Sequence, residues 1–414
     1  MRVLIFHKIN YINAKDTVFS HISSFRKYFP DDFSTTYYNC NSKIHPYLKH
    51  SKYDVVLLHY SFLAERFNTT KKQWNRYINI LKEITGYKIA LPQDEYIKSN
   101  WLCNMFKKIG VSTIYTCFDG AVSRKLYPLE NIDFVHVLTG YVNEVSNIKQ
   151  NLLPYKKRPI DIGYRARTIP FYLGKHGQLK TELATVFINE LRGSEFTYDI
   201  LNTTDSGKNV ISGKNWFKFL ANCKAVLGCE GGSDLIDPNG KIISCIKKYV
   251  STHKNATFEE AEEHCFRENK NKLDAHAFSP RIFEAAQTKT LQLLVEGKYN
   301  GIVKPGVHYI EIKKDFSNVE EILNKLKDIE YCKKIIENSY ADLIMSSKYS
   351  YRNFSSEMAT YIKKNVTPQS LELSDRVKHT LVGFLISFNT CFTFLTNLVS
   401  FIAIKTVRYF YARN

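Results

Sequence analysis

Ser279, Pro280, Arg281 and Glu284 stand at the start of one predicted helix, 280–287. Serine before a helix and proline at its first position are typical of a helix start, where backbone N–H groups are free to bind an anion. Arg281 adds a positive charge at that end, and the Glu284 carboxylate can accept hydrogen bonds from two neighbouring hydroxyls. The segment therefore predicts a site for a phosphate and a ribose. The alternative is an ordinary helix start without a ligand.

Three cations near the predicted strand 160–165 could neutralise a diphosphate. Arg165 and Arg167 are two residues apart, so the alternation of a strand puts both side chains on the same face. Lys180 follows in the predicted helix 178–191 and completes the set that we expect to bind phosphate. In so basic a chain, the alternative is that all three are solvated surface cations.

Two adjacent glycines, Gly231 and Gly232, follow the predicted strand 225–229. Glycines after a strand let the backbone approach a ligand closely, and a plain turn explains them nearly as well. The neighbouring Glu230 and Asp234 could contact sugar hydroxyls, and the sequence does not decide this point.

Polar side chains also stand at predicted strand ends in the first half of the chain. Asp94 and Glu95 follow one such strand, and either carboxylate could take the proton from an acceptor hydroxyl if the reaction inverts. His136 lies near the end of another strand and is a further catalytic candidate. A lone histidine is more often a structural residue, which also applies to His7 and His59.

The sequence predicts neither a metal site nor a bound cofactor. His253, His264 and His276 are too widely spaced for a compact set of ligands, and the chain contains no D-x-D triplet. The glycine patterns of dinucleotide-binding and P-loop proteins are also missing. A diphosphate would therefore be neutralised by cations and helix N-termini.

Short β-rich runs alternate with helical spacing along most of the chain, which predicts the α/β class with parallel sheets. The unbroken apolar run Val55–Leu58 suits a sheet covered on both faces. Two prolines and three adjacent cations in 151–159 indicate a linker. We therefore expect two doubly wound, Rossmann-like domains, 1–150 and 160–365, that face a cleft, followed by a hydrophobic helical tail, 366–414.

Composition narrows the class of protein further. The chain has 414 residues and a net charge of +18, with 44% hydrophobic and 24% charged residues, so it is neither disordered nor a polytopic membrane protein. Its basic residues are spread as single lysines and pairs rather than gathered in a nucleic-acid-binding block. The nine cysteines include no C-x-x-C pair, and we expect reduced thiols, as in a cytosolic protein.

The tail contains an uncharged run, 380–404, with Arg376 and Lys378 before it and Lys405 after it. The run is long enough to cross a bilayer, but polar residues recur along it at helical spacing. It could therefore span a membrane, lie in its surface as an amphipathic helix, or pack on the globular body. We expect a peripheral or monotopic anchor on an anionic leaflet, because cations on the far side would disfavour a single span.

The segment around Glu284 resembles the sugar-nucleotide signature of GT-B glycosyltransferases, especially the spore-maturation glycosyltransferase-like group. In that group a helix of the type Arg281–Gln287 precedes a strand and a Pro-Gly turn, here Pro305–Gly306. The resemblance covers residues 150–365 and implies that Glu284 binds the nucleotide ribose. The chain departs from it at Ala277, where retaining relatives often carry a second glutamate.

The resemblance implies a metal-independent glycosyltransferase, retaining if it follows those relatives, that moves a sugar from a nucleotide-sugar donor to an acceptor hydroxyl. Relatives of this kind build bacterial surface glycans, so the expected acceptor is a polysaccharide, lipopolysaccharide or lipid-linked glycan. The expected location is cytoplasmic, at the inner face of the cell membrane, with no nucleic-acid partner. The alternative, favoured by Ala277, is a non-catalytic GT-B-like scaffold on the membrane surface of a glycan assembly system.

Overall fold

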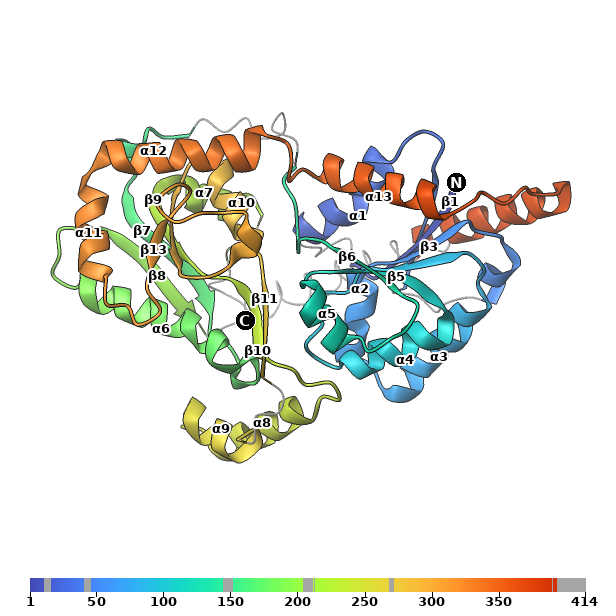
Figure 1. Ribbon diagram of the computed structural model, residues 1–414, viewed down its shortest axis with the longest axis horizontal. Helices are drawn as coiled ribbons and strands as arrows, with labels where there is room; N and C mark the ends of the chain where they lie inside the picture. The colour runs from blue at the N-terminus through green and yellow to red at the C-terminus, as the bar shows by residue number, and fades with distance from the viewer. Residues whose placement is uncertain are drawn as a thin grey trace, which may run out of the picture.

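Two parallel β-sheets organise the chain, each covered by helices, and they lie side by side (Figure 1). This arrangement confirms the predicted α/β class with two doubly wound domains. The computed structural model describes residues 1–10, 16–40, 46–143, 152–203, 211, 213–267, 272–388 and 390–392.

The N-terminal sheet has six parallel strands in the order β2-β1-β3-β4-β5-β6. Leu4 and Phe6 of β1 lie in the core on one face, and Val3 and Ile5 lie in the core on the other. Burial on both faces explains why the central strands are unbroken apolar runs. The bounds are β1 Arg2–His7, α1 Asp16–Tyr28, β2 Ser34–Asn39, β3 Val55–Leu58, α2 Tyr60–Leu63, α3 Lys71–Glu83, β4 Tyr87–Ala90, α4 Ser99–Ile109, β5 Val111–Thr116, α5 Gly120–Leu126 and β6 Asp133–His136.

The C-terminal sheet has five parallel strands in the order β13-β12-β9-β7-β8. Its central strand, β9, pairs with β7 on one side and β12 on the other. The bounds are β7 Ile160–Arg167, α6 Gly174–Leu191, β8 Tyr198–Thr203, α7 Lys214–Asn222, β9 Cys223–Gly228, α10 Arg281–Gln287, β12 Leu291–Val295, β13 Ile310–Ile312, α11 Val319–Lys327 and α12 Ile329–Tyr340.

An insertion that the sequence pattern did not predict separates β9 from α10. Its two strands, β10 (Gly231–Leu235) and β11 (Lys272–Ala277), pair antiparallel, and α8 (Lys241–Thr252) and α9 (Phe258–Cys265) lie between them in the chain. A disulfide joins Cys245 to Cys265, so the expectation that all cysteines are reduced is wrong for this pair. The two cysteines are 20 positions apart in sequence. Only the packing of α8 against α9 brings them together, and the sequence pattern did not predict that packing.

Helix α13 (Tyr351–Asn365) lies on the N-terminal domain, whereas the predicted division placed these residues in the C-terminal domain. It packs along α1 on the N-terminal sheet (Figure 1), and Phe354, Met358 and Ile362 are buried in the same core as Val3. The chain thus returns to its first domain after completing the second, a crossing that local periodicity does not reveal.

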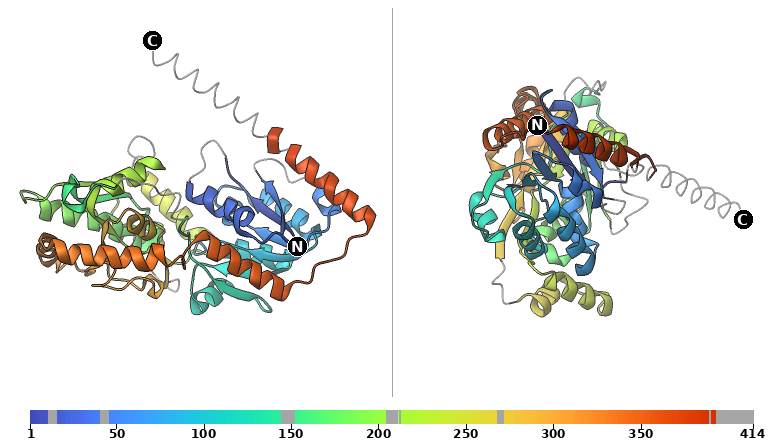
Figure 2. Two further views of the ribbon diagram at one scale, coloured as in Figure 1. Left: turned by 90° about the horizontal axis from the view of Figure 1, so that it is seen from above. Right: turned by 90° about the vertical axis from the view of Figure 1, so that its right-hand side faces the viewer.

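The tail is helical over the described residues between 373 and 392, and it packs against the N-terminal domain (Figure 2). Val382 and Ile386 are buried there, while Phe384, Phe388 and Phe392 are exposed. Among the described residues, no helix is both long and apolar enough to cross a membrane. Most of the second half of the predicted run 380–404 lies outside the described residues.

A fully buried arginine organises the loop after β4. The guanidinium of Arg66 donates hydrogen bonds to the carbonyl oxygens of Leu63, Gln93, Asp94 and Ile97, at 2.7–3.1 Å. A buried cation is costly unless its donors are satisfied, so this loop is fixed by the charge that it surrounds.

The same loop joins the two domains. The backbone N–H of Asp237 donates to the Tyr96 carbonyl at 2.7 Å, and the Lys98 N–H donates to the Asp237 carbonyl at 2.7 Å. The Asp237 carboxylate in turn accepts from the N–H groups of Lys241 and Ile243 at the start of α8. The loop therefore connects the N-terminal sheet to the insertion of the C-terminal domain.

We expect Arg66→Met to lower the free energy of unfolding by roughly 3–5 kcal/mol, because it leaves buried carbonyl groups without donors. Urea denaturation of the full chain measures the change. Arg76→Met, at an exposed position of α3, is the matched control and should change stability by less than about 0.5 kcal/mol. Equal effects of the two substitutions would contradict the role assigned to Arg66.

Candidate functional site

Glu284 lies in the first turn of α10 beside an aromatic ring and a cation. Its Oε2 accepts a hydrogen bond from Nε1 of Trp216 on α7, at 2.7 Å. The guanidinium carbon of Arg281 lies 5.1 Å from the centre of the Trp216 ring, and Nη1 donates to the Arg165 carbonyl at 2.7 Å. Burial raises the pKa of Glu284, and the Trp216 hydrogen bond and the charge of Arg281 oppose that rise. The carboxylate is thus held in a fixed position suited to accepting hydroxyl groups.

The charges of two predicted cations, Lys180 and Arg281, act on Cys229 just after β9. Burial raises the pKa of the Cys229 thiol, and the charges of Lys180 and Arg281 oppose the rise while Glu230 adds to it. Lys180 is on α6 and Arg281 on α10, so helices from either side of the sheet bring positive charge to the same strand end. Such a pair can stabilise an anion at the carboxyl edge of a parallel sheet.

The other two cations lie on one face of β7, as predicted, but they differ in their partners. Arg165 and Arg167 share the face of β7 opposite Tyr164, but Nη2 of Arg165 pairs with Oδ2 of Asp199 at 2.5 Å. The Arg165 guanidinium also lies 4.4 Å from the centre of the Phe219 ring. Its charge is therefore balanced within the domain, whereas Arg167 is exposed at the end of the strand.

The predicted capping of α10 by Ser279 does not occur. Pro280 is the N-cap, and no side chain caps the helix. The N–H groups of Ile282 and Phe283 donate to the carbonyl oxygens of Ser279 and Pro280, at 3.1 and 3.0 Å. Because these donors are used locally, the Arg281 side chain is a better candidate for binding an anion than the helix start.

Gly231 and Gly232 serve strand pairing where the sequence suggested contact with a ligand. They begin β10 and pair with Ala277 and His276 of β11. Gly232 has φ +96°, and a β-carbon there would lie 2.0 Å from the Ala275 carbonyl oxygen. Any larger residue would therefore separate β10 from β11.

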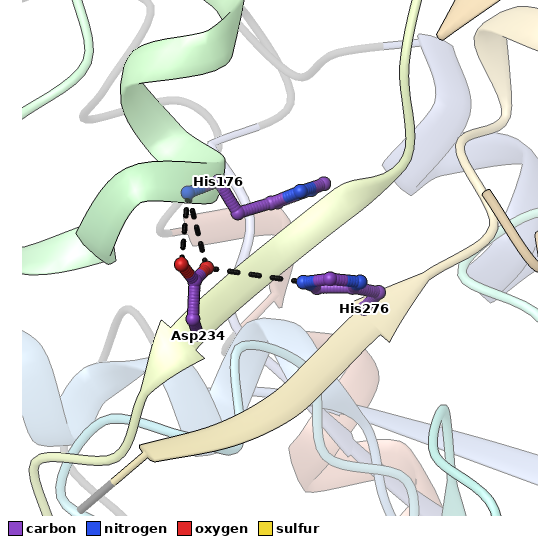
Figure 3. A group of neighbouring side chains, drawn as sticks. All are labelled: His176, Asp234 and His276. Atoms are coloured by element: carbon purple, nitrogen blue, oxygen red, sulfur yellow. Dashed lines mark hydrogen bonds and ion pairs between the residues drawn. The ribbon is translucent and has the colours of Figure 1, made fainter. Parts of the chain in front are cut away.

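Next to the glycines, His176 and His276 surround the carboxylate of Asp234 (Figure 3). Both Asp234 oxygens accept the backbone N–H of His176, at 3.0 and 3.1 Å, which fixes the first turn of α6. Nε2 of His276 lies 3.8 Å from Asp234 Oδ1. Glu230 is 4% exposed and accepts the Tyr299 N–H at 2.7 Å, so it positions a loop rather than a ligand.

The three residues in Figure 3 have ligand atoms within 4.8 Å of one another, which raises the question of a metal. The two imidazole rings stack face to face, with centres 3.9 Å apart and planes at 22°. Ring nitrogens offer their lone pairs in the ring plane, so stacked rings direct them side by side and not toward one ion. The arrangement does not fit a metal as it stands, and the metal-free site remains a prediction.

On the N-terminal side, the three predicted catalytic residues occupy different environments. Asp94 is exposed and accepts a hydrogen bond from the Tyr96 hydroxyl at 2.9 Å. Its charge contributes, after burial, to the raised pKa of Tyr172, which lies just before α6 in the other domain. Asp94 is thus close enough to the C-terminal domain for its charge to act on Tyr172.

Glu95 is completely buried, which contradicts its proposed role as a base that meets an acceptor. Its carboxylate accepts from the Thr116 hydroxyl and the Cys117 N–H at 2.9–3.0 Å, and burial raises its pKa to about 7. His136 is exposed at the end of β6, and its Nε2 lies 3.2 Å from Nδ2 of Asn300 in the C-terminal domain. His136 thus bridges the domains.

His7 and His59 are fully buried at the ends of β1 and β3, as structural histidines. Nε2 of His59 lies 3.0 Å from Nδ1 of His21 on α1, and the ring of His21 is surrounded by aromatic rings that include Tyr351 and Phe354. Burial lowers the pKa of His21 to about 3 and places that of His59 well below its usual value. Burial and the charge of Arg26 lower the pKa of His7 to about 4.

Trp216 and Asp199 were missed by the sequence analysis. Trp216 is 68 residues from Glu284, so no spacing rule links the two. The chain has three tryptophans, and this rarity was the one signal that could have drawn attention to Trp216.

Solved structures similar to this chain inform us about its fold. No protein-family model and no curated protein sequence matches the chain. An alpha-glucosyltransferase solved with UDP and a 13-mer DNA containing a HMU base has a TM-score of 0.51 and 10% identity, over 88% of this chain and 99% of that one. Anabaena Alr3699/HepE, solved with UDP and glucose, has a TM-score of 0.48 and 11% identity, over 88% of this chain and 100% of that one. The first likeness shows that the chain shares the two-domain fold of that alpha-glucosyltransferase.

We expect the free energy of unfolding to fall as the pH drops below about 6.5. The buried histidines stay neutral in the folded protein, whereas the unfolded chain takes up protons near the usual pKa of 6.5. Their stabilisation is thus complete above that pH and is lost as the pH falls toward 3–4. Each histidine can contribute a slope of up to about 1.4 kcal/mol per pH unit.

Denaturation at several pH values checks this dependence. His21→Gln, which cannot titrate, should have a smaller slope between pH 6.5 and 4, while the exposed control His253→Gln should keep the full slope. An unchanged slope in His21→Gln would contradict the assignment.

Proposed function

We propose that the protein is a glycosyltransferase that moves a sugar from a nucleotide-sugar donor to an acceptor hydroxyl. The observation that carries the proposal is the fixed Glu284 carboxylate, bound to Trp216 and adjacent to Arg281, with Lys180 near the same strand end. The resemblance of the segment around Glu284 to the spore-maturation glycosyltransferase-like group supports the same role. The shared fold is compatible with this function and does not by itself establish it.

In this proposal, the Glu284 carboxylate accepts hydrogen bonds from the ribose hydroxyls, and Lys180 and Arg281 neutralise the charge of the diphosphate. The bond between the anomeric carbon and the diphosphate oxygen breaks, and a bond from that carbon to the acceptor oxygen forms. Cations aimed at the departing diphosphate stabilise the charge that develops on it, so they lower the barrier of this step. The nucleoside diphosphate leaves as the second product.

The acceptor proton needs a destination. Asp94 is the candidate base if the transfer inverts, because its carboxylate is exposed toward Tyr172 and oriented by Tyr96. The retaining outcome implied by the resemblance remains open, since Ala277 stands where retaining relatives often carry a glutamate.

The acceptor that we propose is a surface glycan or a lipid-linked glycan, such as a polysaccharide or lipopolysaccharide precursor, at the inner face of a bacterial cell membrane. DNA is a second candidate, because the alpha-glucosyltransferase with this fold was solved with DNA and this chain carries a net charge of +18. A non-catalytic scaffold is less well supported, because it gives no reason for a carboxylate, an indole and two cations to converge.

We expect one of UDP, GDP, ADP or CMP, or its sugar, to raise the melting temperature of the full chain. A ligand at 100 times its Kd stabilises the folded state by about 2.7 kcal/mol. Glu284→Gln and Arg281→Gln should each weaken binding roughly tenfold or more, because each removes a charge-assisted contact. Trp216→Phe keeps an aromatic ring but removes the hydrogen bond that orients Glu284, so we expect a smaller loss.

Glu337→Gln is the matched control, since this exposed glutamate pairs with Lys289 on the surface. It should bind the nucleotide as the unmodified chain does. Folded protein that responds to none of the nucleotides would refute the donor site. When a nucleotide does bind, transfer of its radiolabelled sugar to lipid-linked glycan or to DNA identifies the acceptor class.

A further inference from the structure

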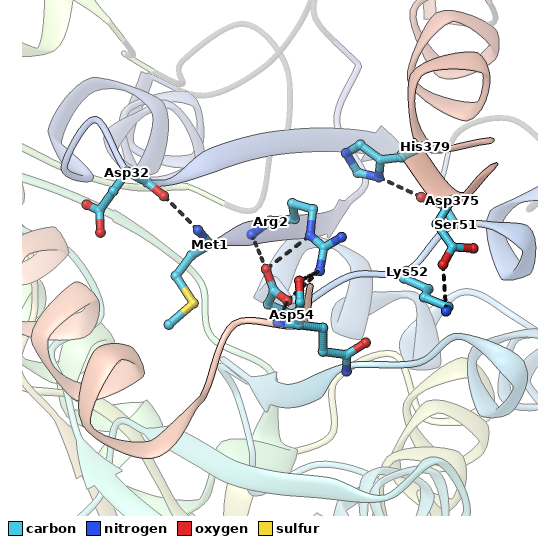
Figure 4. A network of polar contacts seen from close by, with 9 residues as sticks. Met1, Arg2, Asp32, Ser51, Lys52, Asp54, Asp375 and His379 are labelled. Carbon is cyan, nitrogen blue, oxygen red and sulfur yellow. Dashed lines mark hydrogen bonds and ion pairs between the residues drawn. The ribbon is translucent and has the colours of Figure 1, made fainter. Parts of the chain in front are cut away.

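The tail helix, the described residues between 373 and 392, is fastened to the N-terminal domain by polar contacts (Figure 4). Nζ of Lys52 pairs with Oδ2 of Asp375 at 2.7 Å, and Oγ of Ser51 lies 2.6 Å from Nδ1 of His379. Apolar contacts add to these, because Val382 and Ile386 are both 4% exposed and belong to the core of the N-terminal sheet. The orientation of the helix about its own axis is therefore fixed.

The segment before the helix is held as well. Oδ1 of Asp54 accepts the backbone N–H of Gln369 at 2.9 Å, and the Arg2 guanidinium donates to the Gln369 carbonyl at 3.0 Å. Arg2 and Asp54 are themselves paired at 2.7 Å (Figure 4). The chain thus enters the tail helix from a defined point on the first strand.

The opposite side of the helix is a continuous apolar stripe. Six residues spaced by three or four positions fall within an arc of about 100°, at 3.6 residues per turn. The stripe lies about 150° from Val382 and Ile386, so it faces away from the domain. Its members and their exposed fractions are Leu373 77%, Val377 61%, Leu381 57%, Phe384 68%, Phe388 65% and Phe392 59%.

Charges are arranged around the stripe by sign. Arg376 and Lys378 are exposed and flank it, each about 100° from its centre. The acidic Glu372 and Asp375 lie on the side nearer the protein, and Asp375 is neutralised by Lys52. A surface with an apolar centre, cationic borders and no acidic residue among its described members is complementary to an anionic lipid layer.

We propose that the tail helix lies in the plane of an anionic membrane surface, with the apolar stripe inserted among the acyl chains and the fixed face holding the N-terminal domain against the leaflet. Apolar burial supplies the binding energy, and Arg376 and Lys378 contact the lipid phosphates. A second copy of the chain is a poorer occupant, because pairing two stripes would place cationic borders beside each other. The helix lies on the N-terminal domain, away from the C-terminal one (Figure 2).

Cosedimentation of the full chain with vesicles tests the proposal. We use phosphatidylcholine vesicles with 30% phosphatidylglycerol, and pure phosphatidylcholine vesicles as the neutral comparison. The chain should bind the anionic vesicles at least about tenfold more tightly. Phe384→Ser/Phe388→Ser should reduce binding to anionic vesicles roughly tenfold or more, because it removes apolar area from the centre of the stripe.

Matched variants separate the stripe from general surface effects. Val307→Ser/Met345→Ser removes exposed apolar residues elsewhere and should leave binding unchanged. Arg376→Gln/Lys378→Gln should weaken binding to anionic vesicles, whereas Arg76→Gln/Arg124→Gln, exposed cations of the same domain, should weaken it less. Phe388→Trp should give a blue-shifted emission, quenched by brominated lipid, if the stripe enters the membrane.

Equal binding of the unmodified chain and the Phe384→Ser/Phe388→Ser variant would overturn the proposal. So would a concentration-dependent dimer that the variant abolishes, in a chain that does not bind vesicles, since the stripe would then be a contact between copies. Vesicle binding needs neither donor nor acceptor, so its failure is distinct from failure of the proposed glycosyl transfer.

Discussion

The burial of one positive charge fixes one of the loops through which the two domains meet. Arg66 is enclosed by the loop after β4, and three carbonyl groups of that loop turn inward to accept its hydrogen bonds, together with the Leu63 carbonyl of α2. The outer side of that loop is then left to pair with the backbone of Asp237. Asp237 in turn supplies its carboxylate to the start of α8. A single desolvated guanidinium is thus linked, through two short loops, to the placement of the insertion beside the N-terminal sheet.

The site depends on the same principle of satisfied burial. Glu284 is held by the Trp216 indole, while Arg281 remains exposed next to it. Arg165, in contrast, is balanced by Asp199 and is less available to a ligand. The difference between these two arginines lies in their neighbours, because a cation paired inside the domain gives up much of its attraction for an anion. A cation such as Arg281, which forms no ion pair within the domain among the described residues, is better suited to a diphosphate.

Periodicity predicts what is local in this protein and fails where distant segments meet. The central strands, such as β1 and β3, were predictable because burial on both faces requires unbroken apolar runs. β10 was not, since Gly232 is required by the carbonyl of Ala275 on a strand more than 40 positions later. Contacts between distant segments also explain three other features that the sequence did not predict. These are the burial of Glu95, the pairing of Arg165 with Asp199 and the return of α13 to the first domain. Glu284 could be proposed from the sequence because its helix start and its resemblance to a known signature are both local.

If the tail helix binds a membrane as we propose, it places the two domains differently relative to the bilayer. Its inner face is fixed to the first domain by Lys52 and Ser51, so a surface bound to the stripe would hold that domain at a set orientation. The C-terminal domain, which carries Glu284, contacts the first domain through Asp237 and the loop after β4. An acceptor on a lipid carrier would then reach the strand end near Asp94 by moving along the leaflet. A soluble nucleotide sugar would approach the other domain from the solvent. In the arrangement that we propose, a membrane-bound acceptor and a dissolved donor would approach different domains, and the hydrogen bonds of Asp237 with Tyr96 and Lys98 join those domains.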